Sequence, residues 1–254
     1  MAGPLLRATG LEKQYGQVKA LQGADFEVDA GEVVALIGDN GAGKSTLVRM
    51  LSGSEQADGG EIEFEGRPVR LSTPIEARAL GIETVFQDLA LAPHLDPIQN
   101  LYLGREVMRG GLLGRLGFMD TPAMREAGKR TFASLGSTVR DFSGSIGAMS
   151  GGQKQSIAVA RAAAWASKVI FLDEPTAALG VVQTKGVLDL IRRVRDEGIG
   201  VVFISHSMPH VLEVSDRVQV MRHGRRVATY QGSTSSVEEL VGAMTGALDE
   251  RDAA

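Results

Sequence analysis

The chain has 254 residues, which is enough for one α/β domain of ordinary size with a substantial buried core. Its 27 basic and 31 acidic residues leave a net charge of −4 without any Lys/Arg run, so nucleic acid is not an expected primary partner. The absence of cysteine excludes disulfides and thiolate metal sites. No apolar stretch approaches the roughly 18 residues of a transmembrane helix, and residues 1–6 lack a charged leader region, which predicts a cytoplasmic protein.

The first predicted elements are strands. Residues 26–28 and 62–65 alternate between apolar and charged side chains, a pattern typical of half-exposed antiparallel strands. Between them, the apolar run 33–37 predicts a further strand, and the amphipathic stretch 47–51 predicts a helix. A glycine-rich segment joins this strand to this helix.

This segment matches the phosphate-loop pattern G-x-x-x-x-G-K-[ST] in its required strand–turn–helix setting. Glycines let the backbone curl round an anion, so that N–H groups and the helix N-terminus face the phosphate oxygens. Lys44 can reach the β- and γ-phosphates, Ser45 can supply a ligand to Mg²⁺, and Thr46 is placed to help hold the phosphates. A chance glycine-rich turn is the weaker interpretation. We therefore expect a nucleotide on Gly38, Asp39, Asn40, Gly41, Ala42, Gly43, Lys44, Ser45 and Thr46.

The middle of the chain predicts a helical insertion. Residues 82–86 predict a strand that ends at Gln87. Residues 88–165 then show several helical patterns and no convincing strand, with a glycine-rich interruption at 110–117.

Two later strands are predicted to be buried on both faces, because their apolar runs, 169–172 and 201–204, are continuous. Polar residues follow both runs. Since parallel strands present their carboxyl ends at one edge of a sheet, four strand ends are expected to converge on one nucleotide. These ends are Gly38, Gln87, Asp173 and His206.

The last part of the chain predicts a hairpin and a helix. Residues 217–221 and 227–230 flank the turn residues His223-Gly224 and read as paired strands. Residues 235–238 predict a capping box, and residues 247–254 predict a polar tail. The helix after the box would carry one apolar face formed by Val237, Leu240, Val241 and Met244.

Two further groups of residues indicate phosphate chemistry. Asp173 and Glu174 follow a buried strand, where one carboxylate can serve a metal shell and the other can orient an attacking water. Ser150-Gly151-Gly152-Gln153 precedes a helical stretch and offers a second anion-binding helix N-terminus with Ser150 as cap. The alternative for this second group is a helix cap without a ligand.

Taken in order, the phosphate loop, Gln87, residues 149–153, residues 171–175 and His206 resemble the ATP-binding subunit of an ABC transporter, over about residues 5–245. The resemblance implies an α/β fold, with a P-loop NTPase (RecA-like) core, an antiparallel β subdomain and a helical insertion of the ABC ATPase type. It implies a single domain over residues 1–246, with the helical subdomain at about 88–165 inserted in the core.

The resemblance also implies roles for individual residues, with ATP and Mg²⁺ as the cofactors. Tyr15 would stack on adenine, Glu174 would be the general base, and His206 would contact the γ-phosphate. Gln87 would join the Mg²⁺ shell together with Ser45 and Asp173, and it would sense the membrane subunit. The family's signature sequence would bind ATP held by an opposite subunit through Ser150, Gly151, Gly152 and Gln153. A packed aromatic residue remains the alternative for Tyr15, and a hydrogen-bonded strand-end histidine the alternative for His206.

Two positions depart from the family pattern. Met149 stands where the family usually has leucine, a volume-conserving substitution. Gly180 stands in residues 177–180 where the family's D-loop usually has aspartate, so the contact that this carboxylate makes between subunits is in doubt.

Within the family, residues 88–95 and 99–106 are similar to monosaccharide importers of the ribose, xylose and fructose type. Residues 175–180 and 205–210 look especially like fructose-import subunits. This likeness implies a homodimer, because the chain has one cassette and no internal repeat. It further implies integral-membrane permease subunits, an extracytoplasmic sugar-binding protein as an indirect partner, and a peripheral position on the cytoplasmic face of the cell membrane.

One structural question and two alternative functions stay open at this level. Leu89, Leu91, Leu95, Ile98 and Leu101 could form an apolar groove for a permease helix, or they could form the core of the helical insertion. A soluble ABC ATPase acting on DNA or ribosomes is the second functional hypothesis. A P-loop kinase or GTPase is the third.

Overall fold

The computed structural model describes residues 3–135, 139, 141–177 and 179–247. Its larger sheet has six strands in the order β10-β9-β3-β8-β7-β6. All neighbours in this sheet are parallel except β9 and β10, which form the predicted antiparallel hairpin. The strands are β3 (Val33–Ile37), β6 (Ile82–Val85), β7 (Val169–Asp173), β8 (Gly200–Ile204), β9 (Arg217–Arg222) and β10 (Arg225–Gln231).

The smaller sheet is antiparallel and has the order β2-β1-β4-β5. Its strands are β1 (Leu6–Tyr15), β2 (Val18–Val28), β4 (Gly59–Phe64) and β5 (Arg67–Pro68). The predicted alternation is seen in β2, where Phe26 and Val28 are buried and Glu27 between them is half-buried. One face of this sheet therefore packs on the core while the other meets solvent.

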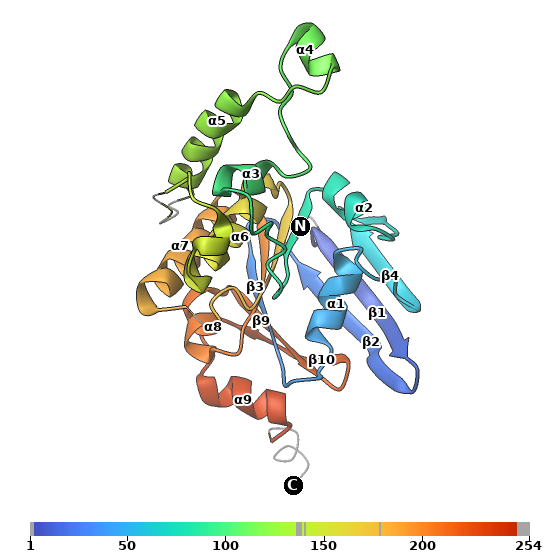
Figure 1. The fold of residues 1–254 in the computed structure, drawn as a ribbon. Coiled ribbons are helices and arrows are strands. Elements are labelled where there is room, and N and C mark those ends of the chain that lie inside the picture. Colours follow the sequence, from blue (N-terminus) through green and yellow to red (C-terminus); the bar gives the residue numbers. More distant parts are fainter. Residues whose placement is uncertain (1–2, 136–138, 140, 178, 248–254) are drawn as a thin grey trace.

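Strand β3 lies between the two halves of the core. Val33, Ala35 and Ile37 belong to an apolar cluster with helices α6 (Gly151–Trp165), α7 (Val181–Asp196), α8 (Met208–Val214) and α9 (Val237–Thr245). Val34 and Leu36 belong to a second cluster with α1 (Lys44–Leu51), α2 (Pro74–Ala79) and the smaller sheet. Because successive side chains of a strand point to opposite faces, β3 is covered on both sides, as Figure 1 shows. The phosphate loop that follows β3 is thus fixed by a fully buried strand.

The segment between β6 and β7 is helical, as the sequence predicts. It contains α3 (Pro97–Tyr102), α4 (Gly111–Arg115), α5 (Thr121–Ser134), the 3₁₀ helix Ile146–Ala148 and α6. Its described residues form one isolated β-bridge, between Met108 and Met119, in place of a strand. Figure 1 shows α4 and α5 projecting away from the larger sheet, at the end of the molecule opposite α9. None of the helices in the described ranges has the length and hydrophobicity that a bilayer crossing requires.

The prediction of a capping box at residues 235–238 is wrong by one residue. Helix α9 begins after Ser236, whose side chain accepts from the N–H of Glu239, while the Glu239 carboxylate accepts from the N–H of Ser236. Ser235 donates its hydroxyl to Gln231 O instead, at 2.8 Å. The turn after β10 uses the first serine, so the second becomes the cap. The predicted tail at 247–254 lies outside the described residues from position 248 onward.

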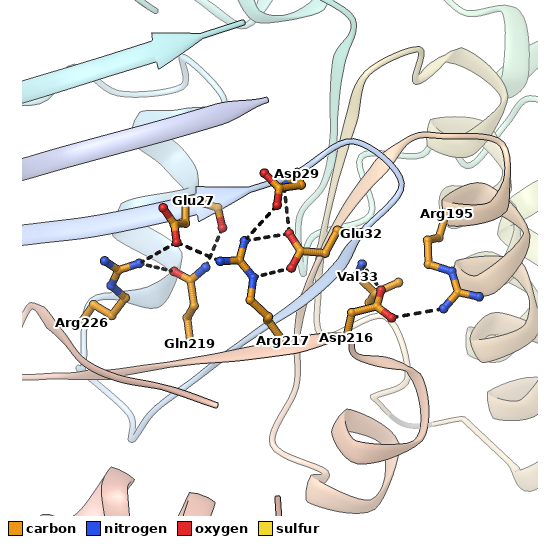
Figure 2. A network of polar contacts seen from close by, with 9 residues as sticks. All are labelled: Glu27, Asp29, Glu32, Val33, Arg195, Asp216, Arg217, Gln219 and Arg226. Atoms are coloured by element: carbon orange, nitrogen blue, oxygen red, sulfur yellow. Dashed lines mark hydrogen bonds and ion pairs between the residues drawn. The ribbon is translucent and has the colours of Figure 1, made fainter. Parts of the chain in front are cut away.

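A network of charged side chains joins the two sheets, and Figure 2 shows it from close by. Arg217 on β9 donates to Glu27 on β2 at 2.8 Å, and it forms a two-pronged contact with Glu32, next to β3. The buried Gln219 donates to Glu27 O at 2.6 Å. Asp216, which directly precedes β9, accepts from the N–H of Val33 at 2.8 Å. The network therefore ties the start of β3 to the start of β9 and, through Glu27, to the smaller sheet.

Candidate functional site

A polar pocket of about 540 Å³ lies at the carboxyl edge of the larger sheet. Residues that follow β3, β6, β7 and β8 line it, so the predicted convergence of strand ends is seen at Gln87, Asp173 and His206. Gly38 does not line the pocket. The predicted site residues that do are Tyr15, Asn40, Gly41, Gly43, Lys44, Ser45, Thr46, Gln87, Asp173, Glu174 and His206.

The backbone of the phosphate loop requires glycine at two of its positions. A Cβ on Gly38 would lie 2.3 Å from Met221 O, because β9 runs directly beside the end of β3. A Cβ on Gly43 would lie 2.7 Å from Ala20 O, and φ at Gly43 is 102°, a value that L side chains rarely adopt. Gly38 and the buried Ala42 thus support the loop without lining the pocket. Asp39 contributes its carbonyl, which accepts from Lys44.

Lys44 crosses the loop with its side chain. Its ammonium donates to Gly38 O at 2.6 Å and to Asp39 O at 2.9 Å. Burial lowers the pKa of this ammonium, while the carboxylates of Glu174, Asp173 and Asp39 raise it. Lys44 is therefore a buried cation beside a loop whose backbone can bind an anion. A bound phosphate would supply the negative charge that stabilises this cation.

Asp173 and Glu174 face the loop from the end of β7. Asp173 Oδ2 lies 3.4 Å from Ser45 Oγ, and burial raises the pKa of this carboxyl against the lowering effect of Ser45 and Lys44. Glu174 has a left-handed backbone, with φ of 54°, and its N–H donates to Ile204 O at 3.1 Å. The structure holds this carboxylate in an unfavourable backbone conformation, which is a feature of functional sites.

The Glu174 carboxylate is half-buried and weakly satisfied. Its Oε1 atom is buried and makes no hydrogen bond of normal geometry to a described residue, although His206 Nε2 lies 3.0 Å away. Burial raises the pKa of Glu174; His206 lowers it, Asp173 raises it and Lys44 lowers it. A half-buried carboxylate beside a phosphate loop, with a raised pKa, is suited to accept a proton from a water molecule.

The remaining predicted pocket residues lie at its rim. Gln87 is exposed and lines both this pocket and a neighbouring one of about 730 Å³. Tyr15 ends β1 and is 41% exposed, so it lies outside the buried core. Its hydroxyl donates to Glu55, its ring lies 5.7 Å below Lys13 Nζ, and Arg49 pairs with Glu55 at 3.2 Å.

The signature residues lie elsewhere. Ser150 caps α6 as predicted, because its hydroxyl accepts from Gln153 N and Gln153 Oε1 accepts from Ser150 N. Ser150, Gly151 and Gln153 are exposed, and none of them lines the pocket. Gly152 packs near Leu179, which belongs to the predicted D-loop; Ala178 in that loop lies outside the described residues.

Sequence reasoning missed Arg161. This side chain on α6 donates to Ala90 O at 2.8 Å and to Leu89 O at 3.2 Å, and Ala90 has a left-handed backbone with φ of 48°. The signature helix is thereby tied to the segment that follows Gln87. A lone arginine in an otherwise apolar helical stretch was the available signal, but the carbonyl partners lie 71 and 72 residues away.

A second, apolar pocket of about 140 Å³ lies between α3 and α5. Its lining bears on whether the five residues Leu89, Leu91, Leu95, Ile98 and Leu101 form a permease groove or the core of the insertion. Ile98 and Leu101 are buried and belong to the core, which corrects the groove interpretation for Leu101, while Leu95 and Ile98 also line this pocket. Leu89 and Leu91 are half-buried against the core and do not line it.

The polar pocket fits a nucleotide with Mg²⁺. The described residues contain no cluster of three or more His, Cys, Asp or Glu side chains that could hold a metal by themselves. Mg²⁺ commonly binds through one or two carboxylates together with substrate phosphates. Ser45, Asp173 and Gln87 offer a hydroxyl, a carboxylate and an amide in one pocket, which is the donor set that such shared binding needs.

Comparison with known proteins agrees with this geometry. Residues 21–177 match the family model described as ABC transporter. Fructose import ATP-binding protein FrcA from Rhizobium meliloti is 47% identical over 97% of this chain and 95% of that protein. Xylose/arabinose import ATP-binding protein XylG from Sulfolobus acidocaldarius is 42% identical over 95% of this chain and 94% of that protein. Ribose import ATP-binding protein RbsA 2 from Burkholderia pseudomallei is 41% identical over 96% of this chain, but over only 47% of that protein.

Solved structures show the same fold. A nucleotide-free ATP-binding cassette from an ABC transporter superposes with a TM-score of 0.79 at 27% identity, over 96% of both chains. The ADP conformation of an ATP-binding cassette of an ABC transporter gives 0.78 at 26% identity, over 96% of this chain and 95% of that one. The chain therefore belongs to the ABC transporter family, in which it is an ATP-binding cassette with the P-loop ATPase fold.

Proposed function

We propose that this cassette hydrolyses ATP to drive a monosaccharide importer, with a fructose-like sugar as the transported molecule. The observation that carries the proposal is the gathering of Lys44, Ser45, Asp173, Glu174 and His206 around one pocket behind a phosphate loop. The 47% identity to a fructose import ATP-binding protein, over nearly the whole of both chains, supports the sugar class. The sugar itself would contact other subunits.

In this proposal each pocket residue has a distinct role. The loop from Gly38 to Thr46 would cradle the phosphates, with Lys44 on the β- and γ-phosphates. Tyr15 would stack on adenine, held by Glu55. Glu174 would take a proton from the attacking water while the bond between the γ-phosphorus and the β–γ bridging oxygen breaks, so that ADP and phosphate leave. His206 would contact the γ-phosphate and orient the Glu174 carboxylate.

Ser45, Asp173 and Gln87 would hold Mg²⁺. The ion would neutralise phosphate charge when it is bound. Ser45 and Asp173 are already 3.4 Å apart, so this chain presents a hydroxyl and a carboxylate to the same point. Gln87, at the rim, would join them when a nucleotide is present.

The exposed signature residues would act on a second copy of the chain. Ser150, Gly151, Gly152 and Gln153 lie at the N-terminus of α6 and outside the pocket of their own subunit. A head-to-tail homodimer would place this helix N-terminus against the γ-phosphate of ATP in the partner subunit. Gly180 would leave the D-loop contact without the usual carboxylate.

Permease subunits would bind this cassette at the cytoplasmic face of the membrane. The side chains that line the pocket between α3 and α5 include the apolar Leu95, Ile98, Tyr102, Met119 and Met124, which suit the apolar face of a short helix, and the charged Asp96, Glu106 and Arg125. A sugar-binding protein on the opposite side of the membrane would act through the permease.

Two substitutions test the ATPase assignment. Glu174→Gln removes the proton acceptor but keeps the size of the side chain, so we expect ATP binding to persist and the hydrolysis rate to fall about 100-fold or more. Lys44→Ala removes the buried cation, so we expect weaker ATP binding. Fluorescent-nucleotide titration and phosphate release measure the two quantities separately. Hydrolysis by Glu174→Gln at the normal rate would remove Glu174 from the role of general base.

Affinity purification from native membranes tests the transport assignment. We expect a multi-span permease and a sugar-binding protein to remain with the chain, and ligand binding by the latter would identify the sugar. Recovery of ribosomes or DNA in place of a permease would favour the soluble ABC ATPase hypothesis and overturn the importer assignment.

A further inference from the structure

The segment between α3 and α5 carries a dense group of exposed apolar side chains. We call residues 107–119 the apolar tip; they leave the end of α3, form α4 and return to the start of α5. Figure 1 shows α4 standing clear of the body, at the end of the molecule opposite α9. No residue of α4 is buried. The exposed fractions reach 71% for Leu112, 66% for Leu116 and 55% for Phe118.

The apolar tip is folded, although it buries little. Its backbone is closed by the bridge between Met108 and Met119 and by the bond from Arg109 N to Phe118 O at 2.9 Å. Gly114 permits this closure, because a Cβ there would lie 1.9 Å from Arg109 O. Apolar burial ordinarily drives folding, so an ordered turn that holds its apolar side chains outward indicates an external partner.

The charge of the apolar tip is positive. Residues 107–119 contain Arg109 and Arg115 and no acidic residue, whereas the whole chain carries −4. The two acids at the base keep their negative charge, but hydrogen bonds hold them away from the tip: Glu106 accepts from Gly104 N at 3.0 Å and Asp120 accepts from Ala123 N at 3.1 Å. Exposed leucine and phenylalanine beside arginine is the combination that favours the interface of an anionic bilayer.

The shape of the apolar tip favours the same partner. A peptide or helix is usually received by a groove, and the groove here is the pocket between α3 and α5, at the base of the tip, where Leu103 and Met119 form part of the wall. The tip itself projects outward (Figure 1). A small apolar projection can enter a deformable lipid layer without a surface of matching shape.

We propose that the apolar tip inserts into the interfacial layer of an anionic membrane, beside the permease that the neighbouring pocket would receive. This inference rests on the proposed function, which brings the cassette to a membrane. The bilayer contact would orient the cassette before and during permease binding. It would also raise the local concentration of the chain at the membrane surface.

Vesicle flotation tests the inference with the full chain alone. We expect the protein to float with phosphatidylcholine vesicles that contain phosphatidylglycerol and to remain in solution with phosphatidylcholine alone. Leu112→Asp combined with Leu116→Asp should weaken binding about tenfold or more, because two apolar side chains are lost from the lipid contact. Arg109→Gln combined with Arg115→Gln should remove the preference for phosphatidylglycerol.

Matched controls separate lipid contact from misfolding. Ile75→Asp places one aspartate, half the added charge of the double variant, at a side chain that is 75% exposed on α2, and we expect it to float like the wild type. Thermal unfolding of the Leu112→Asp, Leu116→Asp double variant should match the wild type, because these side chains are exposed. The chain has no cysteine, so a polarity-sensitive dye on Leu112→Cys should shift to the blue with anionic vesicles, while the same dye on Ile75→Cys should not.

Several results would overturn the inference. They are absence of flotation with either vesicle, equal flotation by the double aspartate variant, or tip-dependent self-association in gel filtration. Binding of the tip to detergent-solubilised permease without any vesicle binding would assign it to a protein contact instead. Flotation requires neither ATP nor permease, so loss of ATPase activity or of permease co-purification would count against the proposed function alone.

Discussion

At the scale of single residues, Glu174 concentrates the unfavourable features of the site. Its backbone is left-handed, its carboxylate is half-buried, and one oxygen has no hydrogen bond of normal geometry to a described residue. Each of these costs folding free energy, and neighbouring bonds, including that from its N–H to Ile204 O, hold the arrangement in place. We interpret this as stability given up to keep a proton acceptor beside the phosphate loop.

The pH dependence of stability should reveal this cost. Burial raises the pKa of Glu174 in the folded chain above the ordinary value of about 4.3, which the unfolded chain keeps. At a pH between the unfolded and the folded pKa, the folded chain therefore binds more protons than the unfolded chain. The free energy of unfolding therefore falls as pH rises through that window, and the cost persists above it. Glu174→Gln removes the ionisation. In urea denaturation without nucleotide, we expect this variant to gain stability over the wild type as pH rises from about 4.5 to 8.

Glu65→Gln provides the control for that measurement. Glu65 also has a positive φ, of 51°, but its side chain is 50% exposed and pairs with Lys168 at 2.6 Å. Comparison of the two glutamine variants isolates the effect of burial from that of the backbone. A constant stability difference between Glu174→Gln and the wild type over the whole pH range would contradict the burial argument.

At the scale of elements, Arg217 links three parts of the fold. It joins β9 to Glu27 on β2 and to Glu32 before β3, and its own side chain is only 17% exposed (Figure 2). These carboxylates raise its pKa further above the ordinary arginine value. The smaller sheet is thereby fixed against the sheet that carries the phosphate loop.

Arg217→Met should destabilise the fold by about 2–4 kcal/mol, because it leaves Glu32 without its cation and Glu27 with only the longer pair to Arg226 at 3.9 Å. Denaturant unfolding measures this change. Arg7→Met is the matched control, since Arg7 pairs with Glu63 at 3.6 Å between side chains that are 45% and 36% exposed, and we expect a loss below about 0.5 kcal/mol. Equal losses in the two variants would show that the network adds no more than a surface pair.

At the scale of the whole molecule, one chain carries two separate elements for which we propose phosphate binding. The phosphate loop lines the pocket, and the N-terminus of α6 faces solvent with Gly151 exposed. A Cβ on Gly151 would meet no atom within 4 Å, so a substitution there tests assembly without disturbing the fold.

Glu174→Gln with ATP should form a dimer, because bound ATP would persist between two subunits. Adding Gly151→Asp should abolish that dimer, since the new carboxylate would repel the γ-phosphate, while an acid in the first turn of α6 is compatible with the helix. Gel filtration with light scattering measures the mass, and nucleotide titration should show ATP binding to the monomer unchanged. A dimer that survives Gly151→Asp would argue against the head-to-tail arrangement.

Local spacing in the sequence predicted the phosphate loop, most of the strands and the cap at Ser150, because each depends on residues a few positions apart. It did not predict strand β1 or helices α2 and α7. It also led to the expectation that strand ends converge, which the structure shows for Gln87, Asp173 and His206. It failed by one residue at the cap of α9, where two adjacent serines could each serve and the preceding turn decided between them.

Only the tertiary structure decided contacts between distant residues. The pairing of β3 with β8 and β9 and of β6 with β7, the tie from Tyr15 to Glu55 and the contact of Arg161 with Ala90 each join positions at least 40 residues apart. The exposure of the apolar tip was likewise decided only by the tertiary structure. A run such as Leu112-Leu113 is compatible with a buried or an exposed position until the surrounding elements are placed. Short-range pattern fixes which element forms, and the packing of the whole chain fixes what each side chain meets.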